Sequence, residues 1–157
     1  MRGLAILAVP LVLAACDSRE VVSICAERGD PAGAVTAAFH AADGSWAVLA
    51  SDGEAGAATL SLGMFGEPAL PRLWRLAENT MRVLPEVEPS PCGDLPLMAV
   101  RVVFDDGSVI YRQTTCTGNA LSRAATALLD AAGTDGATEP DARGPVARLG
   151  EACERLS

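Results

Sequence analysis

The sequence contains no lysine, and this absence removes several kinds of chemistry at once. All 12 basic residues are arginine, against 20 acidic residues, and the formal net charge is −8. No lysine can therefore act as a Schiff-base nucleophile or a general base. A chain this acidic is also a poor partner for nucleic acid, whose phosphates attract basic surfaces. We expect no nucleic-acid partner.

Histidine and aromatic residues are almost as scarce. His40 is the only histidine, and aromatic residues make up 4% of the chain. A Ser–His–Asp site needs a histidine base and no serine lies in a GxSxG-like turn, so we interpret His40 as an ordinary surface residue. Histidine-rich metal sites are excluded by count, and no DxDxDG-like calcium loop occurs. We expect no catalytic residues, no cofactor and no metal, with an acid-residue hydrolase as a less favoured alternative.

No hydrophobic run is long enough to cross a membrane, but a short one stands at the start. Residues 4–13 are apolar apart from Pro10, and Arg2 precedes them. About ten apolar residues are half of what a bilayer requires. A positive residue followed by such a short run is typical of an export signal. The run ends in the letters LAAC at residues 13–16.

This ending resembles the lipobox of bacterial lipoproteins, in which a leucine, two small residues and a cysteine follow one another. The resemblance covers only residues 1–16. It implies that residues 1–15 are removed and that acyl chains on Cys16 hold the protein on a membrane of a Gram-negative envelope, facing the periplasm. Asp17 resembles the signal that retains enteric lipoproteins in the inner membrane. The outer membrane is the alternative location. The alternative is a secretory peptide cleaved nearby, with Cys16 free or paired.

The remaining chain has the length of one domain with a hydrophobic core. We predict a short tether over residues 16–24 and a single periplasmic domain over residues 25–157. Within this domain, the Gly/Asp/Pro-rich stretch near 133–145 is predicted to be a mobile connection. The tether keeps the domain close to the membrane, because an extended chain of this length reaches at most about 30 Å.

Four cysteines remain once Cys16 is assigned to lipid: Cys25, Cys92, Cys116 and Cys153. An even number in an exported chain predicts two disulfides, with three possible connectivities. No pair has the CxxC spacing of a redox or zinc motif. We favour Cys92–Cys116, because a turn between them brings the chain back. Cys25–Cys153 would then join the two ends of the domain.

The first half of the domain contains strand patterns. Asp43-Gly44, with apolar residues on both sides, predicts a hairpin. Residues 35–40 could instead form a short helix that begins after Asp30. A turn near Asp52 precedes another expected strand at residues 58–62.

The helical patterns complete an α+β fold. Residues 70–84 carry apolar side chains at helical spacing, with Pro71 in the first turn. Asn119 is a candidate N-cap for a helix that ends before Gly133. Residues 146–156 show a third, shorter pattern. We expect a disulfide-stapled antiparallel sheet of about four or five strands, with two or three helices packed on one face.

The strongest strand pattern surrounds Asp106-Gly107, a favoured two-residue hairpin turn. With these two residues as the loop, Arg101 lies directly across from Arg112. Like charges in this position repel, so an anion should lie near them. Arg101 and Arg112 would then form a small anion-binding patch for a ligand or a partner carboxylate. Alternatively, an acidic residue of the same chain neutralises the two arginines, or the register separates them.

No motif beyond residue 16 indicates a chemistry. The expected function is a non-catalytic protein-binding module of the cell envelope, as an accessory subunit or an inhibitor of an envelope hydrolase, with an unidentified envelope protein as partner. A small-ligand or lipid binder is the alternative, and it requires an enclosed apolar cavity. An exposed apolar patch would favour the partner-binding module.

Overall fold

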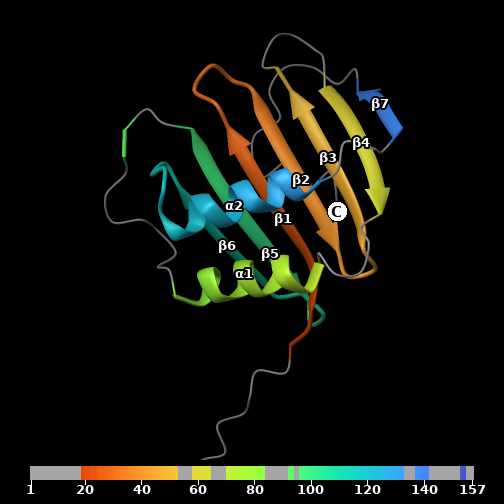
Figure 1. Ribbon diagram of the computed structural model, residues 1–157, viewed down its shortest axis with the longest axis vertical. Helices are drawn as coiled ribbons and strands as arrows, with labels where there is room; N and C mark the ends of the chain where they lie inside the picture. The colour runs from red at the N-terminus through yellow and green to blue at the C-terminus, as the bar shows by residue number, and fades with distance from the viewer. Residues whose placement is uncertain are drawn as a thin grey trace, which may run out of the picture.

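Within the part of the chain that the structure describes, seven strands form one antiparallel sheet, and two α-helices cover one of its faces (Figure 1). The sheet order is β6-β5-β1-β2-β3-β4-β7. The strands are β1 (Val21–Gly29), β2 (Val35–Ala41), β3 (Ser45–Ser51), β4 (Ala58–Met64), β5 (Leu97–Phe104), β6 (Val109–Thr114) and β7 (Ala137–Asp141). The helices are α1 (Leu70–Val83) and α2 (Ala120–Ala131).

The structure is a computed structural model. It describes residues 19–52, 58–64, 70–83, 92–93, 96–132, 137–141 and 153–154. The expected signal segment, Cys16, Asp17 and Gly133 lie outside these residues, as does most of the helix expected at 146–156. Within the described part of the chain, no helix is long and apolar enough to span a bilayer.

The predicted fold class is confirmed, but the predicted count of four or five strands is too low. The sequence places residues 21–24 in the tether and residues 137–141 in a mobile connection, whereas the structure pairs both stretches in the sheet. The middle of β1 is buried on both sides. Such a strand lacks the alternation of apolar and polar residues that identifies a half-exposed strand.

Side chains of β1 alternate between two packed layers. Ile24 and Ala26 join a cluster beneath the helices, whereas Cys25 belongs to a second cluster on the opposite side. We call the helix-covered side the front face and the side that carries Cys25 the back face. Because successive strand residues point to opposite sides, the register assigns the residues of β1 to β6 to one of these faces, apart from the irregularity between Val21 and Ser23.

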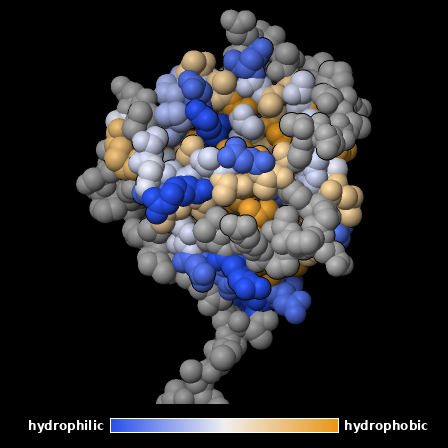
Figure 2. Space-filling model, viewed as in Figure 1, coloured by the Kyte–Doolittle hydropathy of each residue, from blue (hydrophilic) through white to orange (hydrophobic). Residues whose placement is uncertain are grey.

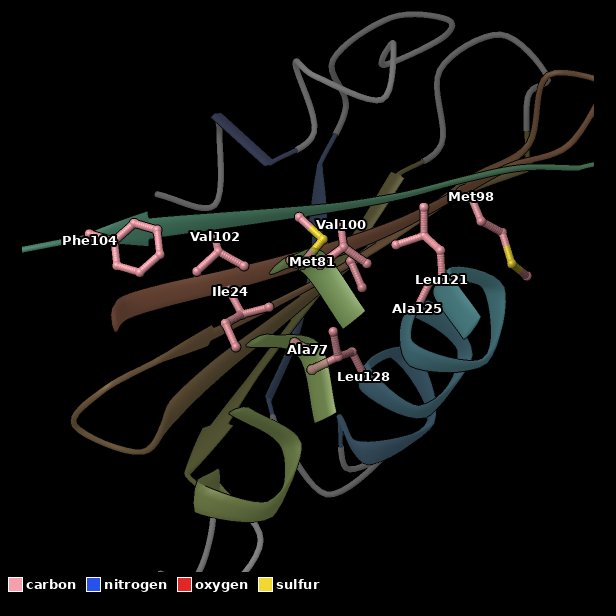
Figure 3. Packing of buried hydrophobic residues seen from close by; sticks show 11 residues of the cluster. Ile24, Ala77, Met81, Met98, Val100, Val102, Phe104, Leu121, Ala125 and Leu128 are labelled. Carbon is pink, nitrogen blue, oxygen red and sulfur yellow. The ribbon is translucent and has the colours of Figure 1, made fainter. Parts of the chain in front are cut away.

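The front core lies between β1, β5 and both helices. Figure 3 shows side chains of β5, including Val100 and Val102, pointing toward the helices, where Met81 of α1 and Leu128 of α2 lie. All four side chains are 2% exposed or less. Burial of one such side chain contributes about 1.5–3 kcal/mol, so this layer holds both helices on the front face.

The hairpin predicted around Asp43-Gly44 is confirmed. β2 pairs with β3 so that His40 lies opposite Trp46. Gly44 has a φ of +88°, a backbone conformation that glycine adopts without steric cost. The choice between strand and helix for residues 35–40 is thereby settled in favour of a strand.

The two clearer helices also form where the sequence predicts them. Pro71 falls in the first turn of α1, and Ala77 and Met81 are buried from that helix. Asn119 caps α2, because its side-chain oxygen accepts a hydrogen bond from the Ser122 N–H at 2.7 Å. The side chain therefore satisfies one of the amides that a helix leaves open at its start.

Both favoured disulfides are present. Cys25 is joined to Cys153 with a Cα–Cα distance of 5.9 Å, and Cys92 to Cys116 with a Cα–Cα distance of 4.9 Å. The first bond fixes residues near the C-terminus to the middle of the back face. The second joins residues on either side of the β5–β6 hairpin.

Candidate functional site

The β5–β6 hairpin decides where the two candidate arginines lie. Phe104 pairs with Ser108 through a 3.0 Å hydrogen bond, and the Gly107 N–H donates to the Phe104 carbonyl at 2.9 Å. Three residues, not two, therefore separate the paired ends of the strands. In this register Arg101 lies opposite Tyr111, and Arg112 lies opposite Val100.

The predicted pairing of Arg101 with Arg112 is therefore wrong. The extra turn residue shifts the register by one position, and a shift of one residue exchanges the two faces. Arg101 belongs to the back face and Arg112 to the front face, so the structure does not bring them into one anion patch. The Arg112 guanidinium donates instead to the carbonyl of Tyr111, at 2.7 Å.

A buried acid lies on the back face close to Arg101. Glu27 of β1 is 1% exposed, and its Oε1 accepts a hydrogen bond from the Cys153 N–H at 3.2 Å. Its Oε2 has no hydrogen-bond partner among the described residues. Burial raises the pKa of Glu27 from 4.5 to about 7, against the opposing effects of the Cys153 amide and the positive charge of Arg101.

Glu27 also lies beside the Cys25–Cys153 disulfide. One carboxylate oxygen and the two sulfurs lie within 4.8 Å of one another. Two thiolates and a carboxylate would be a reasonable ligand set for a soft divalent metal, but sulfurs joined in a disulfide are not thiolates. In the oxidised protein this group is therefore a disulfide bond beside a carboxyl group whose pKa is raised.

His40 is not the surface residue that the sequence suggests. It is fully buried on the front face, and its Nε2 lies 2.7 Å from the carbonyl oxygen of Leu128. Because a carbonyl only accepts, this nitrogen carries the proton and donates. Burial lowers the pKa of His40 below its ordinary value of 6.5, and the bond to Leu128 opposes that effect. The imidazole thus joins β2 to the last turn of α2.

Two of the hollows that described residues line bear on the question of a ligand site. The larger one, about 380 Å³, lies along α2 and is lined by residues that include Met98, Arg123, Thr126 and Asp130. The smaller one lies between α1 and the sheet, next to Met81, and measures only about 10 Å³. A space that small holds about one water molecule at most. Glu27 lines neither of these two hollows.

The outer strand β6 carries the polar and aromatic groups that protein interfaces favour. β6 is the first strand in the sheet order, and among the described residues it pairs only with β5. On the back face its Tyr111 donates a hydrogen bond to Gln113 at 3.2 Å and lies opposite Arg101. Tyrosine and arginine are enriched where proteins bind each other. We call Arg101, Tyr111 and Gln113, together with the outer edge of β6, the β6 patch.

Sequence reasoning identified Arg101 but missed Glu27 and Tyr111. Nothing in the local sequence marks Glu27, because its hydrogen-bond partner Cys153 lies 126 positions later in the chain. The correct register would have placed Tyr111 opposite Arg101, but the predicted two-residue turn placed it on the other face. Comparison with known proteins adds no further assignment, since no family model, curated protein or solved structure matches this chain.

Proposed function

We propose that this protein is a membrane-anchored lipoprotein of the Gram-negative cell envelope, and that its periplasmic domain binds another envelope protein without catalysis. The lipobox ending at Cys16 supports the anchor. The β6 patch supports the binding role, and it is the observation that carries the proposal. The domain would act as an accessory subunit or as an inhibitor of an envelope hydrolase.

The β6 patch offers two ways to hold a partner. An outer strand presents backbone N–H and C=O groups to which a partner strand can pair. The side chains of Tyr111 and Arg101 lie beside that edge on the back face, where they would give the pairing specificity. Gln113 is exposed, and so lies where a partner would be contacted first.

Photo-crosslinking in the native host tests this role. A photoreactive residue would replace Gln113 of β6, and a matched one would replace Thr126, which is exposed on α2 at the opposite face. We expect one envelope protein to be captured from position 113, and to be captured poorly when Cys16→Ser removes the anchor. Capture from position 126 alone, or capture from neither position, would reject the β6 patch as the binding surface.

A ligand-binding role is the second candidate, and the hollow along α2 is the observation that favours it. Its volume of about 380 Å³ lies within the range of small-molecule sites. Most of the lining of this hollow is apolar and it is open to solvent, so a small ligand with an apolar body fits it, whereas an enclosed lipid does not. The cavity described between α1 and the sheet measures only about 10 Å³. Thermal shift measurements with a library of small metabolites test this candidate. A shift that Arg123→Ala abolishes would support it.

An acid-residue hydrolase remains the least supported candidate. Its strongest feature is the raised pKa of Glu27, which is a common property of catalytic carboxyls. However, a glycosidase needs two carboxylates facing each other across a cleft. Glu27 is buried beneath Cys153, and Glu154, whose charge acts on Glu27, is exposed.

A further inference from the structure

The first described residues are held firmly against one end of the sheet. The guanidinium of Arg19 lies 4.9 Å from the ring centre of Phe104 and donates a hydrogen bond to the Ser108 hydroxyl at 3.1 Å. Glu20 and Asp105 exchange two further bonds, because each backbone N–H donates to an oxygen of the other residue at 3.1 and 2.8 Å. Residues 19–20 therefore belong to the domain and not to a free tether.

These contacts shorten the connection to the proposed anchor. Only Asp17 and Ser18 separate Cys16 from Arg19. Three peptide steps span at most about 11 Å, against the roughly 30 Å of a tether that ends at residue 24. Because the β5–β6 turn contacts Arg19 and Glu20 directly, it also lies close to the proposed lipid-bearing residue. The end of the sheet that contains this turn is the end nearest the membrane.

We call this end the base. It contains residues 19–23, the β2–β3 turn, the end of β4 and the β5–β6 turn, which lie along the lower and right side of the sheet in Figure 1. The register aligns these parts. Ala42 donates a hydrogen bond to the Val22 carbonyl at 3.0 Å, and Met64 pairs with Ser45.

Apolar side chains are exposed at the same base. Among the described residues, all the large hydrophobic side chains that are exposed belong to it: Val22 (39%), Leu62 (46%), Met64 (67%) and Val109 (44%). Val109 lies opposite Val103, and Met64 lies two residues beyond Leu62 on the same side of β4. Leu62, Met64 and Val109 therefore point to the back face. Exposed apolar side chains that gather in one region commonly mark a contact with a membrane or a protein.

The front side of the base has a different character. Figure 2 shows the helix-covered face, on which hydrophilic residues gather along the lower edge of the view. The two sides of the base therefore differ in polarity. A domain tethered at this end would lower its free energy by leaning its back side toward an apolar layer and leaving its front side in water.

We propose that the back side of the base, through Leu62, Met64 and Val109, rests on the bilayer that carries the acyl chains of Cys16. This inference depends on the proposed lipid anchor. β6 and β4 are five strand spacings apart, so the contact would be about 24 Å wide. The exposed turns at the base carry Asp43 and Asp106. Anionic headgroups would repel these carboxylates, so the surface that fits the base is a zwitterionic one.

Energy transfer on vesicles tests this orientation. The acylated protein, purified from its host membrane, would be reconstituted into vesicles of phosphatidylethanolamine and phosphatidylcholine with an acceptor dye on some headgroups. A donor dye would be attached through an unnatural residue at Ala42, in the β2–β3 turn, or at Ala32, in the β1–β2 turn at the other end of β2. Both alanines are exposed and lie in turns, so the two labelled proteins form a matched pair.

We expect transfer from position 42 to exceed transfer from position 32 several-fold, since the length of β2 separates them. The paired substitution Met64→Ser with Val109→Ser should reduce this excess, whereas Met64→Leu with Val109→Ile should preserve it. Addition of anionic lipid should also reduce it, and salt should partly restore it. An excess that the serine substitutions leave unchanged would overturn the apolar contact.

Two other outcomes separate the inference from the proposal on which it rests. Equal transfer from the two positions in a protein that stays on the vesicles through Cys16 would overturn the inference and leave the lipid anchor intact. Vesicle binding by a Cys16→Ser protein equal to that of the wild type would overturn the anchor itself. Capture of a protein through a photoreactive residue at position 64, together with equal transfer, would assign the base to a protein partner instead.

Discussion

At the scale of single residues, Glu27 couples the stability of the fold to pH. Burial raises its pKa from 4.5 to about 7, so between these values the folded protein holds a proton that the unfolded chain has lost. The stability that this proton contributes is complete below pH 4.5 and is lost as the pH rises through 7. The difference between the two pKa values corresponds to about 3 kcal/mol.

Glu27→Gln should remove this dependence. The amide stays neutral at every pH and can still accept from Cys153, so we expect the variant to be more stable than the wild type at pH 8 by about 2–3 kcal/mol, and similar to it at pH 4.5. Urea unfolding followed by circular dichroism at both pH values measures the difference. Glu154→Gln is the matched control, because Glu154 is exposed and lies beside the same disulfide. A wild-type advantage at pH 8 would contradict the expectation.

Gly63 is required by the aromatic ring beside it. A Cβ placed on Gly63 would lie 2.3 Å from Cζ2 of Trp46, much closer than two carbon atoms can approach. Trp46 is 4% exposed and lies opposite Gly63 in the sheet, so the ring has little room to move away. Overpacking of a filled site costs about 1–3 kcal/mol. We therefore expect Gly63→Ala to destabilise the protein by that amount.

The matched control for this change is Ser61→Ala, two residues earlier on the same side of β4. It introduces no new atom, and we expect a change within about 0.5 kcal/mol. Tryptophan fluorescence should shift in the Gly63→Ala protein alone, because only that substitution displaces the ring of Trp46. Equal stabilities for the two variants would show that the ring moves freely.

At the scale of elements, the sequence predicts the start of a helix or the position of a turn correctly where one or two residues determine the local backbone geometry. Asn119 predicted the start of α2 because its side chain satisfies a helix amide, and Asp43-Gly44 predicted the β2–β3 turn. β1 was missed because layers on both sides bury it and erase its alternation. The β5–β6 register was missed by one residue because Asp-Gly is compatible with both a two-residue turn and a three-residue turn. That single step separated Arg101 from Arg112.

The cap on α2 gives an element-scale prediction. The Asn119 side chain accepts from Ser122 and also donates to the Thr114 hydroxyl at 2.8 Å, so it joins α2 to the end of β6. We expect Asn119→Ala to cost about 1–2 kcal/mol, from loss of the cap and of the link. Asn119→Asp keeps the acceptor and loses the donor, so its cost should be smaller. Urea midpoints would rank the two variants, and an equal cost would show that the cap contributes nothing.

At the scale of the whole molecule, the two disulfides close very different lengths of chain. Cys25–Cys153 spans 128 residues and fixes the C-terminal part to the back face, whereas Cys92–Cys116 spans 24 residues around one hairpin. In the chain-entropy account, a longer closed loop restricts the unfolded chain more strongly. The expected contributions are about 5 kcal/mol for the first bond and about 3.5 kcal/mol for the second.

Paired alanine substitutions should show which disulfide contributes more stability. They should also show whether the pH dependence of stability that Glu27 causes requires the Cys25–Cys153 bond. Replacing Cys25 and Cys153 by alanine should cost more stability than replacing Cys92 and Cys116, as measured by urea unfolding at pH 6. The first pair also releases the residue that covers Glu27, since the Cys153 N–H is its hydrogen-bond partner. Water would then reach the carboxyl and return its pKa toward 4.5, so the loss of stability between pH 5 and 8 should shrink in the first variant and persist in the second. A pH dependence that survives removal of Cys25–Cys153 would mean that the sheet alone, and not the covalently fixed C-terminal residues, keeps Glu27 protonated.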